Sequence, residues 1–272
     1  LLVQIHSEMP DKSKNHTKEA ATDPNGWLKL TLADITAEAL IGVVRASALQ
    51  NQDGRGFSYI KMDRVDMSGH VDITPEVFVE CTEQEVTRFA LREGDILFNT
   101  RNSVELVGKT GLVRKTPSAP TVFNNNLMRI RVVQSVLPAF LSHQMCAPQF
   151  RANMERVKKA TTSVAAVYGK DLWPLALVIP STTEQQQIVT ELESQLDAVE
   201  KMEAEIDSNL QKSGALRQAI LKKAFDGELV PQDPADEPAA ALLARIRAER
   251  SDKATCSPSR RVRKSATASE PA

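Results

Sequence analysis

Apolar residues recur at steps of three and four through residues 183–225, and no proline interrupts this stretch. This spacing places the apolar side chains in one stripe along an α-helix, as in the seam of a coiled coil. A helix of this length extends over roughly 65 Å at about 1.5 Å per residue. Because that exceeds the width of a compact domain, we expect part of the seam to pair with another helix. The predicted seam consists of Ile188, Leu192, Leu196, Val199, Met202, Ile206, Leu210, Leu216 and Ile220.

Acidic and basic residues are separated along this predicted helix. Residues 183–207 contain eight acidic residues and one base, whereas residues 208–225 contain four bases and no acid. The helix macrodipole favours the same order, so part of the pattern can be explained within a single helix. Two such helices would repel each other in parallel and attract each other when antiparallel. We therefore predict antiparallel pairing with a second copy of the helix, in which Asn209 and Ser213 fix the register.

Between residues 26 and 180 the pattern changes to short apolar runs bounded by turn residues, which is typical of β-strands. Pro138 and Pro148 mark the starts of two short helices, at about 138–145 and 148–159, because proline is tolerated in the first helical turn. The sequence therefore predicts an α+β domain of mixed strands, followed by one long helix at 181–226. The expected strands cover residues 27–32, 57–62, 76–80, 95–99, 108–114, 127–133 and 175–179.

The two ends of the chain are more polar. Residues 1–8 share Leu, Leu, Ile and Glu with residues 242–249, so we interpret residues 1–25 as the tail of a preceding repeat and a linker; the alternative is a chance likeness between two amphipathic helices. Gly227 predicts the end of the long helix, and Pro238 opens a short helix to about residue 250 within an exit segment at 227–250. We expect residues 251–272 to form a disordered basic tail.

Overall charge does not indicate a nucleic-acid partner, because the formal net charge of the 272 residues is only −1. Residues 26–180 contain 18 bases and 15 acids, an excess that permits a phosphate-facing surface. The three cysteines are far apart and the four histidines form no ligand-spaced cluster. We expect a reduced cytoplasmic protein without metal, cofactor, membrane span or signal peptide.

The catalytic motifs that we considered are either incomplete or absent in this sequence. The run Gly108-Lys109-Thr110 resembles the end of a phosphate-binding loop, but Ser103 stands where the first glycine is required. No Gly-x-Gly-x-x-Gly motif follows a strand, and no Asn-Pro-Pro-Tyr segment offers the base pocket of an amino-methyltransferase. We expect no catalysis by this chain.

Several polar residues have the chemistry to contact DNA. Arg101 and Asn102 combine a guanine reader with an adenine reader, although an ordinary polar turn explains them equally well. Asn124, Asn125 and Asn126 form either a base-edge loop or a turn that tolerates left-handed backbone.

Other residues suit contacts with the DNA backbone. The predicted phosphate contacts are Arg55, Lys61, Arg64 and Lys109. A polar segment before the long helix could also hold the DNA backbone through Thr162, Ser163, Tyr168 and Lys170. We assign Trp27 and Trp173 to the core, because each lies in an apolar stretch.

Three segments resemble one protein family. Residues 216–239 read LRQAILKKAFDGELVPQDPADEPA, which closely resembles the repeat that closes each half of the specificity subunit of type I restriction-modification systems. Residues 172–180, followed by Glu184-Gln185 and Ile188-Val189, resemble that family's entry into its long helix, although residues 181–183 depart from the usual Pro-Pro-Leu-x-Glu-Gln pattern. Residues 93–97 and 107–109 resemble its target-recognition domain.

The resemblance implies a DNA-reading module without chemistry of its own, equivalent to the C-terminal half of such a subunit. In that family one target-recognition domain reads half of a split site on double-stranded DNA. Two long antiparallel helices hold the readers apart and dock methyltransferase subunits, and through them restriction subunits. Two alternatives stay open: a coiled-coil assembly protein whose globular domain binds protein, and the recognition portion of a fused methyltransferase-nuclease.

Overall fold

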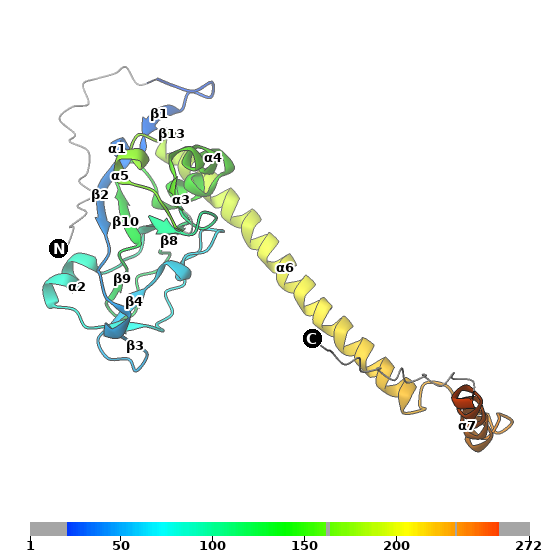
Figure 1. Cartoon of the computed structure of the whole chain (residues 1–272). Coiled ribbons are helices and arrows are strands. Elements are labelled where there is room, and N and C mark those ends of the chain that lie inside the picture. The colour runs from blue at the N-terminus through cyan, green and yellow to red at the C-terminus, as the bar shows by residue number, and fades with distance from the viewer. Residues whose placement is uncertain (1–20, 162–163, 232, 256–272) are drawn as a thin grey trace, which may run out of the picture. The chain divides into compact units, whose positions relative to one another are not determined.

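The computed structural model describes residues 21–161, 164–231 and 233–255 (Figure 1). Two compact units divide the chain, the first ending at Ala198 and the second beginning at Val199. The boundary falls within α6 (Thr182–Phe225), a continuous helix of 44 residues. The predicted α+β class with one long helix is therefore confirmed.

The first unit is built on short, mostly antiparallel strands (Figure 1). One four-stranded sheet has the order β2 (Thr36–Ile41), β10 (Leu127–Val132), β6 (Ile96–Asn99) and β8 (Thr110–Leu112). A second has the order β3 (Gln50–Asn51), β5 (Phe78–Val79), β4 (Phe57–Ile60) and β9 (Thr121–Phe123), with β4 and β9 parallel. Smaller sheets join β1 (Leu28–Thr31) to β13 (Ala176–Ile179), and β11 (Lys159–Ala160) to β12 (Ala165–Ala166) and β7 (Arg101–Asn102).

Helices begin where the sequence offers caps. The side chains of Thr82 and Glu85 form a reciprocal capping box with each other's backbone N–H groups at the start of α2. Proline occupies the first turn of α3 and α4, as predicted. The described helices besides α6 are α1 (Leu32–Ile35), α2 (Glu83–Phe89), α3 (Pro138–Cys146), α4 (Pro148–Val157), α5 (Gly169–Leu172) and α7 (Ala239–Thr255), with 3-10 turns at Ser47–Leu49 and Met62–Arg64.

The β2-β10-β6-β8 sheet has apolar side chains on both faces. Along β6, Ile96 and Phe98 belong to one buried cluster and Leu97 to another, as the two-residue period of a strand requires. The larger cluster also contains residues of α3 and α4, and Val189 from the start of α6. The first turns of α6 are therefore part of the core of the first unit.

A charged side chain lies inside this framework. Arg129 on β10 is only 1% exposed. Its guanidinium donates to the Glu38 carboxylate at 2.5 Å and to the carbonyl of Ala90 at 3.0 Å. Arg131 bridges Glu38 at 3.0 Å and the buried Asp95 at 2.6 Å. This network ties β2 and β10 to the residue that precedes β6, and it supplies the partners that a buried charge requires.

Some sequence-based expectations need correction. Every predicted strand is present but shorter. The elements that were not foreseen are β2, β3, β7, β9, β11, β12, α1, α2 and α5. The last described helix runs to Thr255, beyond its expected end near residue 250. Trp173 is buried as expected, but the assignment of Trp27 to the core was wrong, because Trp27 is half-buried and its Nε1 donates to Glu184.

Acid should weaken the ion network. Burial tends to raise the pKa of Glu38, but Arg129 and Arg131 outweigh burial and hold this pKa below its ordinary value. Ionised Glu38 therefore stabilises the fold above about pH 4, and this contribution is lost as pH falls further. We expect Glu38→Gln to lower the Tm at neutral pH, with a difference from wild type that shrinks on acidification. Thermal unfolding at several pH values measures this, and a difference independent of pH would contradict it.

Candidate nucleic-acid interface

Parallel pairing brings the ends of two strands to one edge of the first unit. Ile60 of β4 lies opposite Phe123 of β9, and the N–H of Asn124 donates to the carbonyl of Ile60 at 2.9 Å. Since the two strands run in the same direction, Lys61 and the loop 124–126 follow them at the same edge. Two candidates that are far apart in the sequence thus become neighbours.

Antiparallel pairing adds the end of β6 to this edge. Leu127 lies opposite Asn99, so Asn126 adjoins the residues that follow β6. The carbonyl of Asn126 accepts from the backbone N–H of Thr100 at 2.8 Å, from its hydroxyl at 3.0 Å and from the buried Asn99 side chain at 3.2 Å. The side chain of Asn124 accepts from the N–H of Asn126 at 2.7 Å. The asparagine loop is therefore held by the strand beside it.

Arg101 and Asn102 continue from this point. They form the short strand β7 rather than a turn, with Arg101 opposite Ala166 and Asn102 opposite Ala165. Arg101 is exposed, whereas Asn102 is half-buried and its side-chain oxygen accepts from the N–H of Ser103 at 2.8 Å. The backbone of Arg101 is thus fixed while its guanidinium faces solvent.

The last candidates lie in the neighbouring β11–β12 hairpin and in the segment after it, where Tyr168 precedes α5 and Lys170 lies within α5. The connection of the hairpin includes Thr162 and Ser163, which lie outside the described residues. Tyr168 is 41% exposed and lies beneath the ammonium of Lys159, which is 5.6 Å from the ring centre. The same ammonium pairs with Asp171 at 3.1 Å. Lys170 is exposed.

Backbone pairing brings these segments to one edge of the first unit, from β4 through β9, β6 and β7 to the segment after the β11–β12 hairpin. We call it the polar edge, and it consists of Lys61, Arg101, Asn102, Asn124, Asn125, Asn126, Tyr168 and Lys170. Asn99 and Thr100, which were not predicted as site residues, stabilise the polar edge because their side chains donate to the carbonyl of Asn126. Asn99 is the polar last residue of the otherwise apolar strand β6. A polar residue at that position is the sequence feature from which its role could have been predicted.

Three predicted phosphate contacts lie outside the polar edge. Arg55 precedes β4 and so lies at the strand end opposite Lys61, and it pairs with Asp53 at 3.1 Å. Lys109 is buried, 6% exposed; burial lowers its pKa, although Asp63 and Asp66 oppose the shift.

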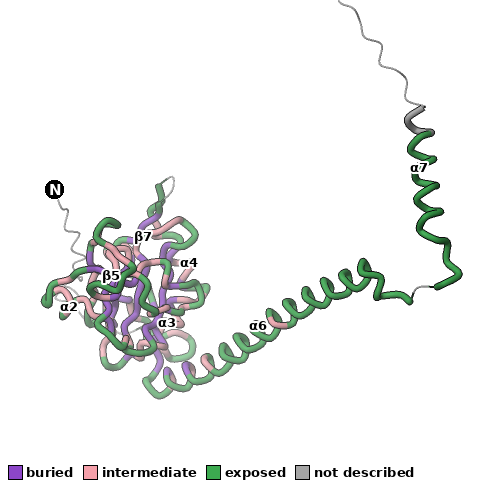
Figure 2. Tube along the Cα trace, turned by 90° about the horizontal axis from the view of Figure 1, so that it is seen from below, coloured by how far each residue is buried: buried purple, intermediate pink, exposed green. Residues whose placement is uncertain are grey.

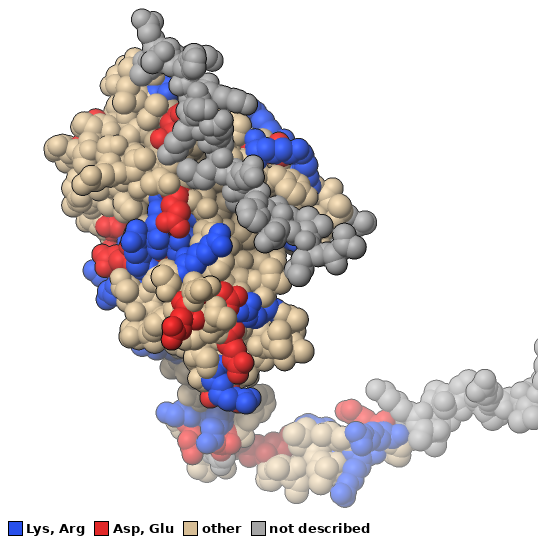
Figure 3. All heavy atoms as spheres, turned by 90° about the vertical axis from the view of Figure 1, so that its left-hand side faces the viewer, with Lys and Arg blue, Asp and Glu red and all other residues tan. Residues whose placement is uncertain are grey.

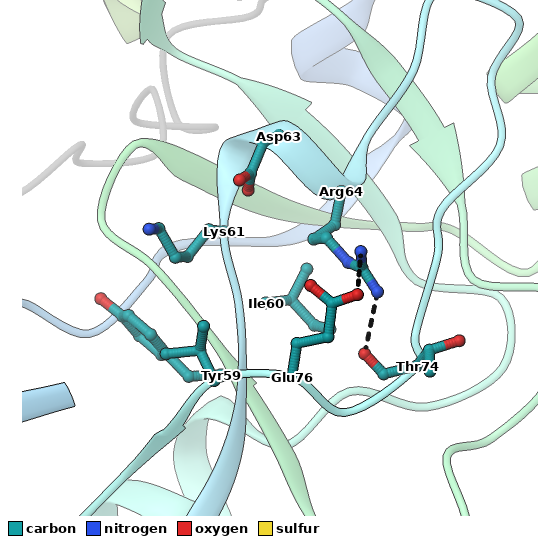
Figure 4. Close-up of a pocket in the computed structure, with 8 residues that line it drawn as sticks. Tyr59, Ile60, Lys61, Asp63, Arg64, Thr74 and Glu76 are labelled. Carbon is teal, nitrogen blue, oxygen red and sulfur yellow. Dashed lines mark hydrogen bonds and ion pairs between the residues drawn. The ribbon is translucent and has the colours of Figure 1, made fainter. Parts of the chain in front are cut away.

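Arg64 is the third, and its guanidinium is already occupied. It pairs with Asp72 at 2.9 Å and Glu76 at 3.0 Å, and it donates to the carbonyl of Thr74 at 3.1 Å. Arg64, Thr74 and Glu76 line a small pocket, and Figure 4 shows the Arg64 guanidinium directed at Glu76 and Thr74 while Lys61 points away. Lys61 directly follows β4 at the polar edge, and it also contributes to the lining of this pocket.

Another face of the first unit offers no broad basic patch. Figure 3 shows acidic and basic side chains close together on this face, where the undescribed residues do not cover it. Intermixed charges produce little net field at a distance, because opposite charges cancel each other. We therefore do not place a nucleic-acid contact there.

The seam of α6 is the second candidate surface. Its first position, Ile188, packs against the core, but exposure rises from 37% at Leu192 to 70% at Leu210. Figure 2 shows the same change from buried to exposed along the helix. Nothing in the described part of the chain covers the later seam positions. No helix among the described residues has the length and apolar character to span a bilayer, and they hold no metal-ligand cluster.

Comparisons with known proteins bear on the family and the fold. No family model matches the chain. It is 32% identical over 255 residues to the type I restriction enzyme EcoKI specificity subunit of Escherichia coli strain K12, covering 90% of this chain and 53% of that protein. It is 23% identical over 235 residues to the StySPI specificity subunit of Salmonella potsdam, covering 83% of this chain and 50% of that protein. The chain thus spans about half the length of these curated relatives.

The fold has a solved counterpart. A structure titled for complex assembly and conformational transition of the type I R-M system superposes with a TM-score of 0.55 at 24% identity, over 78% of this chain and 49% of the solved chain. This likeness supports the fold. The sequence relatives, which match most of this chain, show that it belongs to the family of type I restriction enzyme specificity subunits, of which it spans about half the length.

Proposed function

We propose that the chain recognises DNA sequence as the specificity component of a type I restriction-modification system. The polar edge reads one half of a bipartite site, and α6 pairs with a second long helix that holds another reader at a set distance. The observation that carries this proposal is that a member of this family gathers arginine, asparagine and lysine side chains from four segments onto one edge.

The side chains of the polar edge suit distinct roles. Arg101 presents a guanidinium that can bond O6 and N7 of guanine together, and the amides of Asn102 and Asn125 match the N6 and N7 groups of adenine. Lys61 and Lys170 suit phosphate contacts, which position a protein on the duplex without reading its sequence. Because the backbone beneath these residues is hydrogen-bonded to neighbouring strands, little order has to be gained on binding.

Chemistry on the DNA belongs to partners in this proposal. The chain binds and positions double-stranded DNA, while methyltransferase subunits dock on it and restriction subunits join through them. The chain itself is a non-catalytic recognition subunit without a cofactor.

Exposed apolar positions on α6 support helix pairing. Leu196, Val199 and Met202 are 43%, 44% and 55% exposed. Covering such side chains stabilises an assembly by about 25 cal/mol per Å² of apolar area removed from water. The acidic first part of α6 and its basic end favour an antiparallel partner, either the other half of a longer subunit or a second copy of this chain.

Loss of Arg101 should relax base preference. We expect Arg101→Ala, tested in the full chain by selection from a random duplex pool, to lose about 1–3 kcal/mol of discrimination at one base position. Asn102→Ala should do the same at a neighbouring position. Arg55→Ala is the matched control, because Arg55 is exposed but lies outside the polar edge, and it should leave the selected sequence unchanged. A wild-type chain that enriches no sequence would instead favour the assembly-protein alternative.

Self-association should depend on the seam. Leu210→Glu places a charge among apolar seam residues and should weaken association, whereas Gln211→Glu, at a neighbouring exposed position off the seam, should not. Sedimentation velocity of the full chain measures both variants.

Orientation can be measured in the same assembly. Spin labels at Lys223 of two paired chains should lie several times farther apart than the roughly 10 Å between adjacent helix axes, because antiparallel helices separate equivalent ends. Labels within that short distance would show parallel pairing and contradict the proposal.

A further inference from the structure

The start of α6 is joined to the first unit by an internal glutamine. Gln185 is 1% exposed. Its side-chain oxygen accepts from the N–H of Leu137 at 2.8 Å, and its amide nitrogen donates to the carbonyls of Ser135 at 3.1 Å and Pro180 at 3.0 Å. Both ends of the amide are therefore used, and they connect α6 to the loop before α3 and to the residue after β13.

Two contacts flank this glutamine. The indole Nε1 of Trp27, before β1, donates to Glu184 at 3.0 Å. Arg114, after β8, donates to Glu193 at 2.6 Å. We call Trp27, Arg114, Glu184, Gln185 and Glu193 the helix clamp. Its members come from three separate parts of the sequence and meet on the first turns of one helix.

The contacts cover enough of the helix surface to fix its direction. Residues 184 to 193 extend over about 14 Å of helix at 1.5 Å per residue. At about 100° per residue, the contacting positions occupy roughly half of the circumference. Val189, 5% exposed, adds an apolar contact between Gln185 and Glu193. Contacts separated both along and around a helix resist tilt as well as rotation.

Even a small rotation of the first unit about the start of α6 would change the separation between the two half-sites that the protein can bind. A domain of about 150 residues has a radius of gyration of about 15 Å. A swing of roughly 15° about the clamp would therefore move a point one radius of gyration away by about 4 Å, and more distant points by more. One base pair of DNA rises by about 3.4 Å. A loose joint would let the same protein accept sites whose halves are separated by different numbers of base pairs.

We propose that the helix clamp determines how strictly the protein discriminates the spacing between two half-sites, with Gln185 as its central positioning residue. This inference rests on the proposed function and adds to it a specificity determinant that contacts no DNA. Helix length then sets the mean separation of the two readers, and the clamp sets the tolerance around that mean.

The first test removes the flanking contacts without disturbing the core. Trp27→Phe with Arg114→Gln keeps the ring and a polar side chain but loses both bonds to α6. The full chain is offered duplexes that carry the enriched half-sites at every spacing. We expect wild type to prefer one spacing at least tenfold over its neighbours, and the double variant to accept adjacent spacings within about threefold, with unchanged half-sites. Gln187→Ala, exposed on the same turn, is the control.

Failure of the proposed function and failure of the helix clamp give different results. If wild type enriches no half-site, the proposed function fails, and the clamp is then judged from spin-label distances between Glu83 on α2 and Lys201 on α6. A clamp predicts a narrow distance distribution that broadens in the double variant and in Gln185→Ala. Unchanged spacing preference, or an unchanged distance distribution, together with a lowered Tm would show a purely structural role and overturn the inference.

Discussion

The constraint on which the structure depends is an apolar stripe that continues along α6 after the core has ended. In the first turns, Val189 is buried and Ile188 packs against the domain, so the stripe is covered there. Farther along, the same periodicity continues through Leu196 and Leu210, which are exposed. A helix of this length gains little stability from intrinsic propensity alone, and most helical stability in proteins comes from packing of an apolar face. The later seam is exposed among the described residues, and under the proposed function a partner helix covers it.

Two separate sets of hydrogen bonds hold two different parts of the first unit in place. Hydrogen bonds from Asn99 and Thr100 hold the polar edge in shape, while the bonds of Gln185 hold the start of α6. The β2-β10-β6-β8 sheet lies between them, and its buried Arg129 network keeps the strands together. Under the proposed function, a reading surface and a helix start held by the same unit would pass the geometry of helix pairing to the DNA. In this account, specificity depends on distance as well as on base contacts.

Much of this architecture could be predicted from the sequence, and the exceptions have physical reasons. The long helix was evident because its period persists over many turns without proline. The strand β2 was missed because its sequence, TAEALI, is rich in residues that favour helices, and only its pairing with β10 makes it a strand. The start of α2 could have been predicted from Thr82 and Glu85, which have the spacing of a capping box, but the prediction did not use this pair.

Site residues divide in the same way. Residue chemistry selected Arg101 and the asparagine loop as candidates, but their adjacency depends on pairing of β6 with β10, which local sequence does not encode. Arg64 and Lys109 were chosen for their charge alone. Their carboxylate partners and their burial are properties of the folded chain.

The central claim is that α6 sets the distance between two DNA-reading surfaces. Its most direct test is to insert one heptad after Asp207, which preserves the seam, and to determine the sites selected from a random duplex pool. Seven residues lengthen the helix by about 10 Å, or about three base pairs of DNA. The account predicts the same two half-sites separated by about three more base pairs, and an unchanged separation would contradict it.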